Sequence, residues 1–250
     1  MIIPSQDRGL PGQRRGLRAA LAVLGSACAA ALLLGPAASP VTSQEVITIR
    51  GADSGSHLRL TVNGKRLIVR GWMPPSRLAG CRYRRPRLIA VCPLRGVGRI
   101  ELRMGPSGDM VEVLDPLPAP LTIYLGNGSD KFIGNDERDT CYPGGARRNR
   151  CIGGGGRDIC ITGNRNSDCV GGPGNDYCQH GNGSDGCWGG PGRDVCRMGA
   201  GEDGCHGEGG DDMLFGGPGR DRLYGQRGRD HCDGEQGWGK SQGCEAGPRR

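Results

Sequence analysis

The chain has very few aromatic residues, because only 10 of its 250 residues are Phe, Trp or Tyr. Its hydrophobic fraction is 35%, and 13 Cys and an Ala-rich N-terminus are counted in that fraction. So little bulky apolar side chain argues against the compact core of an ordinary enzyme domain. Three classes remain open, namely a disordered low-complexity chain, a collagen-like chain and a disulfide-stapled repeat.

Long hydrophobic runs are also lacking, since no segment after residue 34 approaches the roughly 20 residues that span a bilayer. The chain begins with an Arg-rich stretch, continues with the apolar run 19–34, and then has small residues and Pro up to Pro40. This order predicts a secretory signal peptide over residues 1–40, and therefore a secreted, extracellular protein with no membrane span after its removal. Cys28 would be removed with it. An uncleaved signal anchor is the alternative.

Acidic residues are in the minority overall, but the net charge of +7 is unevenly distributed. Residues 41–120 contain 13 basic and 6 acidic residues, whereas residues 121–245 contain 14 basic and 19 acidic ones. The basic segment has only Trp72 and Tyr83 as aromatic residues, too few for base stacking. We therefore expect a solvated basic face and no nucleic-acid partner.

Glycine is abundant, with 49 residues, and its spacing has a period of nine. Residues 189–197 read GGPGRDVCR, and residues 216–224 read GGPGRDRLY. Twelve such blocks run from Leu125 to Asp233 with the single inserted residue Pro143, and a thirteenth block, 234–242, has lost the acid. Collagen needs Gly at every third residue and a disordered chain needs no period, so both classes are excluded.

Each block combines a six-residue turn with a three-residue strand. Glycines at positions 1, 2 and 4 permit a tight turn, and strand alternation points position 8 inward and positions 7 and 9 outward. Two blocks then make one coil of a flattened parallel solenoid, an 18-residue unit. Position 1 shows this unit, since it alternates between two sets, Gly153, Gly171 and Gly189 in one and Thr162, His180 and Met198 in the other.

Over residues 125–242 the blocks resemble the haemolysin-type (RTX) calcium-binding repeat, G-G-x-G-x-D-x-U-x, in which U is a large apolar residue. The resemblance implies an all-β fold, a parallel β-roll (β-solenoid) of about twelve nonapeptide repeats, which we assign to residues 121–245. It also implies that Ca²⁺ is held between successive turns of one edge, by position-6 Asp side chains and backbone carbonyls.

The position-6 residues would form two columns, one on each edge of the roll. Coils lie about 4.8 Å apart, so stacked carboxylates without a cation would repel one another. Calcium accepts six to eight oxygen ligands, whereas magnesium's strict octahedral preference suits the turns less well. The alternative is that each Asp caps its own turn. Carried over from the family, the calcium ligands are Asp139, Asp158, Asp176, Asp194, Asp212 and Asp230 on one edge and Asp130, Asp185, Asp203 and Asp221 on the other.

The second column departs from the family pattern at two places. Asn149 and Ser167 occupy position 6 there, and Asp168, one place later, is expected to face solvent. The calcium sites of these two turns are therefore in doubt.

Position 8 is the main departure from the family, because most of its large apolar residues are replaced by Cys. Cysteines bury much less apolar area, so hydrophobic packing alone would not hold the roll. The position-8 residues are Phe132, Cys141, Cys151, Cys160, Cys169, Cys178, Cys187, Cys196, Cys205, Leu214, Leu223 and Cys232.

Twelve Cys remain after removal of Cys28, an even number in a chain bound for an oxidising compartment. We expect Cys81–Cys92 and Cys232–Cys244. Free thiols acting as small hydrophobes, and zinc bound by Cys with His180, His206 and His231, are alternatives, although the spacing disfavours zinc. For the other eight Cys two schemes stay open: rungs across the core (Cys141–Cys151, Cys160–Cys169, Cys178–Cys187, Cys196–Cys205) or staples between coils (Cys141–Cys160, Cys151–Cys169, Cys178–Cys196, Cys187–Cys205).

Residues 44–120 are predicted to form a β-rich cap. Residues 58–62 and 66–69 flank Asn63-Gly64, a strong hairpin signal. Residues 51–59 and 104–112 resemble worn copies of the nonapeptide, and the second keeps Asp109 and Val111. The segment is therefore expected to continue the solenoid.

No Ser/His/Asp arrangement or phosphate-binding loop is apparent, and the many Asp are equivalent by period, whereas acid–base catalysis needs carboxylates in different environments. We therefore expect a non-enzymatic, secreted calcium-binding protein whose folding is coupled to the ion. The alternative is a disulfide-stapled extracellular structural or adhesive scaffold that binds calcium incidentally. The sequence does not identify a protein or surface partner.

Overall fold

The computed structural model describes residues 45–71, 81–84, 89–145, 148–234 and 239–245. These residues form strands and turns, and none belongs to a helix that could cross a membrane. The predicted signal peptide, residues 1–40, and Cys28 lie outside the described residues.

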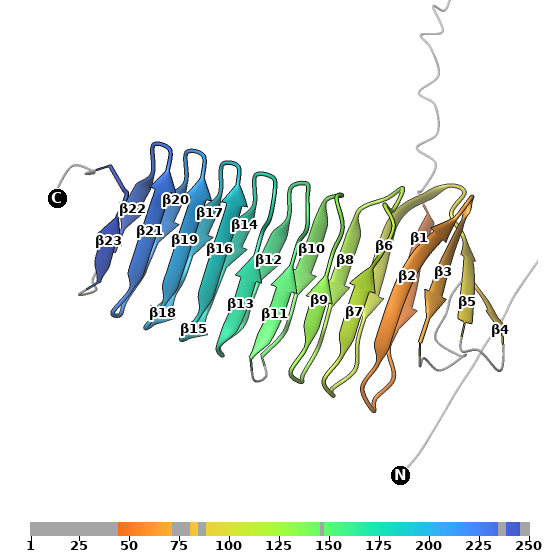
Figure 1. Ribbon diagram of the computed structural model, residues 1–250. Coiled ribbons are helices and arrows are strands. Elements are labelled where there is room, and N and C mark those ends of the chain that lie inside the picture. The colour runs from red at the N-terminus through yellow and green to blue at the C-terminus, as the bar shows by residue number, and fades with distance from the viewer. Residues whose placement is uncertain (1–44, 72–80, 85–88, 146–147, 235–238, 246–250) are drawn as a thin grey trace, which may run out of the picture. The chain divides into compact units, whose positions relative to one another are not determined.

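Two large sheets form most of the molecule, and from β6 onward successive strands of the chain alternate between them, apart from the short β15 and β18 (Figure 1). The first sheet contains, in spatial order, β1 (Glu45–Arg50), β6 (Val97–Arg103), β8 (Leu121–Tyr124), β10 (Asp139–Tyr142), β12 (Ile159–Ile161), β14 (Tyr177–Gln179), β17 (Val195–Arg197), β20 (Met213–Phe215) and β22 (His231–Asp233). The second contains β23 (Lys240–Gln242), β21 (Arg222–Arg227), β19 (Gly204–Gly209), β16 (Gly186–Pro191), β13 (Ser167–Val170), β11 (Asn149–Ile152), β9 (Lys131–Ile133), β7 (Met110–Val113), β2 (His57–Asn63), β3 (Arg66–Arg70), β5 (Ile89–Pro93) and β4 (Arg82–Arg84). A short pair, β15 (Asn182–Gly183) and β18 (Ala200–Gly201), lies in the turns.

The fold is the predicted all-β parallel solenoid. Each of the twelve nonapeptide blocks contributes one strand, and neighbouring strands of a sheet pair in parallel with an 18-residue offset, as in Cys160↔Cys178. The roll is longer than the twelve blocks alone, because each sheet has nine parallel strands. The additional coils come mainly from β1, β2, β6, β7 and β8, whose turns have lost most of the nonapeptide pattern while their strands keep the inward alternation.

The N-terminal end of the roll is closed by antiparallel strands. The predicted hairpin is confirmed as β2 and β3, in which Leu60 pairs with Val69. Strands β5 and β4 extend the second sheet beyond it, also antiparallel. The two worn copies lie side by side, with Leu58 opposite Val111. In the second sheet the antiparallel hairpin therefore covers the pairing edge of the last parallel strand, β2, whereas the first sheet ends at β1.

The tight spacing of the turns requires glycine where one coil passes over the next. Gly192, at position 4 of its block, has a φ of +151°. A Cβ built there would lie 1.3 Å from the carbonyl oxygen of Gly174, one coil away. Any larger residue would therefore push the two coils apart.

The interior between the sheets changes along the axis. In the N-terminal coils it is aliphatic, with fully buried residues such as Leu58, Leu102 and Ile123, and it ends at Phe132. From Cys141 to Cys205 every inward position 8 is a buried cysteine, and Leu214 and Leu223 follow. The predicted inward orientation of position 8 is thus confirmed from Phe132 to Leu223.

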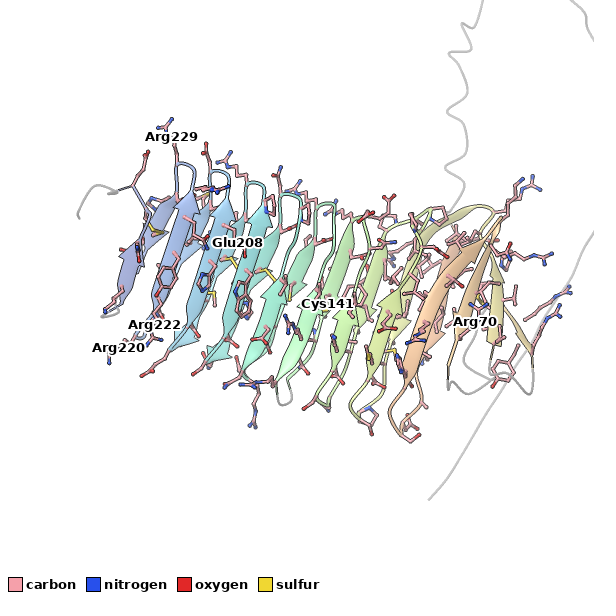
Figure 2. All side chains as sticks on the ribbon, viewed as in Figure 1. Arg70, Cys141, Glu208, Arg220, Arg222 and Arg229 are labelled. Carbon is pink, nitrogen blue, oxygen red and sulfur yellow. A yellow bond between two sulfur atoms is a disulfide. The ribbon has the colours of Figure 1, made fainter. Side chains whose placement is uncertain are left out.

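The disulfides Cys81–Cys92 and Cys232–Cys244 form as predicted. Among the other eight cysteines the rung arrangement is correct in kind, because every bond crosses the core and none joins neighbouring coils of one sheet (Figure 2). The Cα–Cα distances of the crossing bonds are 6.3–6.5 Å, since two layers of small cysteines let the sheets approach within disulfide range. The register differs from the predicted one: Cys141–Cys151 is present, but the next rungs are Cys169–Cys178 and Cys187–Cys196, and Cys160 and Cys205 are free thiols.

The chain's two phenylalanines give a test of this interior. Phe132 is fully buried where the aliphatic core meets the cysteines, whereas Phe215 lies partly exposed on the outer side of β20 under Arg197. We expect Phe132→Ala to lower the free energy of unfolding by about 3–5 kcal/mol, and Phe215→Ala by about 1 kcal/mol. Urea denaturation of the oxidised protein measures both, and equal losses would contradict this core.

Candidate metal centre

The ten predicted calcium ligands all occupy position 6 of a turn, and all are buried with 1–5% of their surface exposed. Turns that lead into the first sheet form what we call the first edge, and turns that lead into the second sheet form the second edge. Arg229 marks the first edge and Arg220 the second, and they lie on opposite sides of the roll (Figure 2). The ten carboxylates therefore form two separate columns.

Hydrogen bonds connect the first-edge carboxylates from coil to coil. From Asp139 to Asp212, the backbone N–H of each first-edge Asp donates to Oδ1 of the Asp one coil further along, at 2.7–2.9 Å. The partners are 18 or 19 residues apart, so the side chains mainly join coils rather than cap their own turns. The column runs without a break through Asp139, Asp158, Asp176, Asp194, Asp212 and Asp230.

The second edge follows the same rule but changes chemistry in the middle. Asn149 accepts from the Asp130 N–H through its amide oxygen, and its Nδ2 donates to the Pro143 carbonyl. Ser167 donates its hydroxyl to the Arg165 carbonyl. These two neutral side chains satisfy their own hydrogen bonds and bring no charge, so the turns that depart from the family pattern need no cation.

Nine of the column carboxylates keep one oxygen that no hydrogen bond reaches. Among the described residues, this orphaned and buried oxygen is Oδ1 in Asp139 and Oδ2 in the others. A carboxylate oxygen that is buried without a partner is costly, because it has lost water and gained nothing in exchange. The residues concerned are Asp130, Asp139, Asp158, Asp176, Asp185, Asp194, Asp203, Asp212 and Asp230.

Glycine at position 1 makes room beside the first-edge carboxylates. A Cβ on Gly189 would lie 2.4 Å from Oδ2 of Asp194, and a Cβ on Gly207 would lie 2.4 Å from Oδ2 of Asp212. The same two Cβ positions lie 2.8 Å from the Gly207 carbonyl oxygen and 2.9 Å from the Gly225 carbonyl oxygen, one coil further along. On the second edge Thr162, His180 and Met198 fill position 1 and are buried, so the two edges differ as the sequence predicted.

Burial raises the pKa values of eight of the column carboxylates. The pKa of Asp158 rises to about 8, first through burial and then through the charges of Asp176 and Asp139. Burial raises the pKa of Asp139, Asp194 and Asp203 to about 7. At neutral pH a bare column therefore holds protons or carries repelling charges, and a bound cation removes both penalties. Burial likewise raises to about 6 the pKa of Asp130, Asp176, Asp185 and Asp212.

A neighbouring histidine does not supply the missing positive charge. His180 Nδ1 lies 3.8 Å from Oδ1 of Asp185 and 3.1 Å from Oγ1 of Thr162. Burial lowers the pKa of His180 to about 4, so its ring is neutral at pH 7. Asp185 therefore shares the need of the other column residues for a cation.

The geometry does not favour the zinc alternative. Among the described residues, the one group with three close metal-ligating atoms is Cys178, Cys187 and Cys196, which contains no histidine and takes part in disulfides. His206 stacks between Trp188 and Tyr224 on the other face of the second sheet. The column sites instead offer only oxygen, the donor set of a hard cation such as calcium.

Asp109 belongs to the second column, although the sequence analysis did not place it among the metal ligands. Its N–H donates to Oδ1 of Asp130 at 2.7 Å, and its two oxygens accept from the N–H groups of Ser56 and Gly105. Both carboxylate oxygens of Asp109 thus have hydrogen-bond partners, so Asp109 is the last residue of the column and needs no ion. The sequence signal for its place in the column is that it occupies position 6 of the worn copy at residues 104–112.

The raised pKa values predict how the ion-free roll responds to pH. An unfolded Asp ionises near pH 4, whereas folded-column residues such as Asp158, Asp194 and Asp212 hold their protons up to about pH 6–8. The folded state therefore binds more protons in this window, and its stability falls as pH rises through it. Urea unfolding of oxidised protein in calcium-stripped buffer should give a lower free energy of unfolding at pH 8 than at pH 5. Asp158→Asn should flatten this slope, and stability that rises with pH would contradict the assignment.

Comparison with known proteins gives a family match at both ends of the repeat region. The model for the RTX calcium-binding nonapeptide repeat, in four copies, matches residues 122–148 and 206–237. No curated protein and no solved structure matches the chain. The unmatched residues 149–205 are those in which every position 8 is Cys. The repeats of this family bind Ca²⁺, and residues 122–148 and 206–237 of this chain are therefore RTX-type calcium-binding repeats.

Proposed function

We propose that this protein is a secreted, non-enzymatic calcium-binding protein in which Ca²⁺ is held between successive turns of the roll and is coupled to folding. The observation that carries the proposal is the row of buried carboxylate oxygens without a hydrogen-bond partner. Calcium supplies the charge and the coordination that these oxygens lack.

The ligands that we assign are the ten column aspartates other than Asp109. The six first-edge turns create five places between neighbours, each with a carboxylate from both sides and the carbonyls of the Gly-rich turns. On the second edge Asp185, Asp203 and Asp221 create two such places. Asp130 stands between Asp109 and Asn149, so its site has a single orphaned carboxylate oxygen.

Coupling to folding follows from where the ligands come from. Each ion joins residues 18 or 19 apart in sequence, which meet only in the folded roll. Calcium therefore binds the native state, and at a concentration of 100 Kd each site adds about 2.7 kcal/mol of stability. Neighbouring sites share a carboxylate, so filling one site orders a ligand of the next.

Two further observations support the setting of this function. Five disulfides join described residues, and such bonds persist in oxidising compartments outside the cytosol. The predicted signal peptide agrees with export. The non-enzymatic role follows from the equivalence of the carboxylates, which repeat one environment along an edge.

A structural scaffold is the second candidate, and the disulfides are the observation that favours it. Three rungs cross the repeat core, and the backbone bonds of the two sheets run through every coil. In that case the oxidised roll would stand without calcium.

Circular dichroism separates the two candidates. We expect reduced, calcium-stripped protein to lack strand signal and to gain it when millimolar calcium is added, because neither rungs nor ions hold the cysteine coils beforehand. Oxidised protein should show a smaller calcium-dependent change together with a higher melting temperature. An unchanged spectrum and melting temperature in both redox states would favour the scaffold.

Two adjacent aspartates provide a matched test of the ligands. Asp212 lies buried in the first-edge column, whereas Asp211 is exposed one residue earlier in the same turn. Asp212→Asn keeps an oxygen for the Asp194 N–H but removes the charge, and we expect the loss of up to two ions because Asp212 borders two sites. Asp211→Asn should lose none. Native mass spectrometry in calcium buffer counts the ions, and equal counts in both variants would overturn the assignment.

A further inference from the structure

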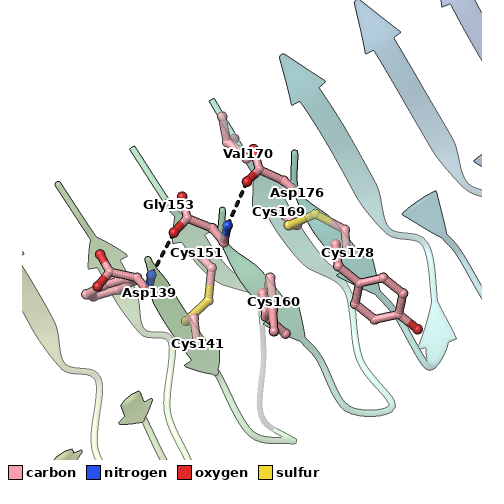
Figure 3. A pocket seen from close by; sticks show the side chains of 14 residues that line it. Asp139, Cys141, Cys151, Gly153, Cys160, Cys169, Val170, Asp176 and Cys178 are labelled. Carbon is pink, nitrogen blue, oxygen red and sulfur yellow. Dashed lines mark hydrogen bonds between the residues drawn. A yellow bond between two sulfur atoms is a disulfide. The ribbon is translucent and has the colours of Figure 1, made fainter. Parts of the chain in front are cut away.

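Eight buried cysteines form a continuous ladder inside the roll. In the first sheet Cys141, Cys160, Cys178 and Cys196 stand in register, and in the second sheet Cys151, Cys169, Cys187 and Cys205 do the same. Because the chain alternates between the sheets, each inner cysteine faces two others across the core, the one before it and the one after it in sequence. Cys160 accordingly lies between the rungs Cys141–Cys151 and Cys169–Cys178 (Figure 3).

The structure contains rungs of both possible kinds. Cys141–Cys151 runs forward from the first sheet to the second, with a Cα–Cα distance of 6.4 Å. Cys169–Cys178 runs forward from the second sheet to the first, with a distance of 6.3 Å. Rungs of both directions therefore occur at nearly the same Cα–Cα distance, within the range of a disulfide.

The sulfur atoms at the centre of the ladder are close enough to exchange partners. The Sγ atoms of Cys178, Cys187 and Cys196 all lie within 4.8 Å of one another. Cys178 and Cys187 belong to different disulfides, so two rungs are in near contact. The free thiols Cys160 and Cys205 stand at either end of this pair of rungs and are buried.

From this geometry we infer that the pairing of the ladder cysteines changes with the redox conditions. The two central rungs shift by one cysteine, and a fourth rung then closes. The thiolate of Cys160 attacks Sγ of Cys169, so the Cys160–Cys169 bond forms and Cys178 leaves as a thiolate. Cys178 attacks Cys187 in the same way, which forms Cys178–Cys187 and releases Cys196. The proton of Cys160 ends on Cys196, and no electrons are gained or lost.

Closure of the last rung needs an oxidant, for which a small external disulfide such as glutathione disulfide is sufficient. Cys196 and Cys205 form a bond, and their two electrons and two protons convert the external disulfide into two thiols. The four resulting ladder rungs are Cys141–Cys151, Cys160–Cys169, Cys178–Cys187 and Cys196–Cys205. Reduction of one rung reverses the sequence, so the ladder has a three-rung and a four-rung state.

Burial controls the rate of this exchange. The thiolate is the attacking species, and burial raises the pKa values of both Cys160 and Cys205. Register shifts should therefore need transient opening of the cysteine coils, which keeps either state persistent once it has formed.

Disulfide mapping by acid-quenched, peptide-resolved mass spectrometry tests the proposal. Wild-type protein is equilibrated in glutathione buffers of reducing or oxidising ratio, and remaining thiols are labelled after denaturation. We expect thiols at Cys160 and Cys205 in the reducing buffer, and loss of both thiols with Cys160–Cys169, Cys178–Cys187 and Cys196–Cys205 in the oxidising one. Glutathione attached to Cys160 and Cys205, with the central rungs unchanged, would overturn the proposal.

Two variants isolate the shift from the closure, and circular dichroism checks that they fold. In Cys205→Ala the last rung cannot form, so the single thiol label should divide among Cys160, Cys178 and Cys196. The control, Cys160→Ala with Cys205→Ala, has no attacking thiol and should retain Cys169–Cys178 and Cys187–Cys196 as its central rungs, with Cys141–Cys151 unchanged. A label confined to Cys160 in the single variant would show a fixed register.

Discussion

Stacked buried carboxylates are the constraint on which this structure depends. Asp176 and Asp194 are typical of the columns: each lies one coil from the next Asp, accepts a backbone N–H on Oδ1, and keeps Oδ2 without a hydrogen bond. The same stacking that hydrogen-bonds the coils therefore accumulates negative charge out of water, which is unfavourable unless a cation shares it. The glycines beside the carboxylates serve the same end, since a Cβ at Gly207 would occupy the space next to Asp212. The first-edge turns therefore need both the Asp at position 6 and the Gly at position 1 that leaves space beside it.

The interior of the roll is stabilised in two different ways along its axis. In the N-terminal coils aliphatic side chains such as Leu102 and Ile123 fill the space between the sheets, and the hydrophobic effect stabilises them. Between Cys141 and Cys205 the buried area per residue is small, and covalent rungs across the core replace it. By restricting the unfolded chain, these disulfides contribute stabilising free energy that apolar burial does not supply in these coils.

Much of this fold follows from the sequence because a strict period leaves few choices. The nine-residue spacing places both columns, the inward position 8, and every strand from β9 to β22 except the short β15 and β18 in the turns. The register of the cysteine rungs could not be predicted, since equal spacing offers every inner cysteine two equivalent partners. The coils before β9 were recognised only in outline, because alternation of apolar residues survives there while the turn glycines do not. Asp109 was visible as part of a worn copy, but its hydrogen bonds, which show that it needs no ion, required the structure.

The inequivalence of the two edges restricts how such a chain can change its length. Duplication of 18 residues adds one whole coil and leaves each later block on its own edge. Duplication of nine would transfer every later block to the opposite edge, so that bulky position-1 residues such as His180 and Met198 would replace the glycines beside the unbroken column. The heritable unit of growth in this molecule is therefore the pair of blocks, and lineages of it should differ by whole coils.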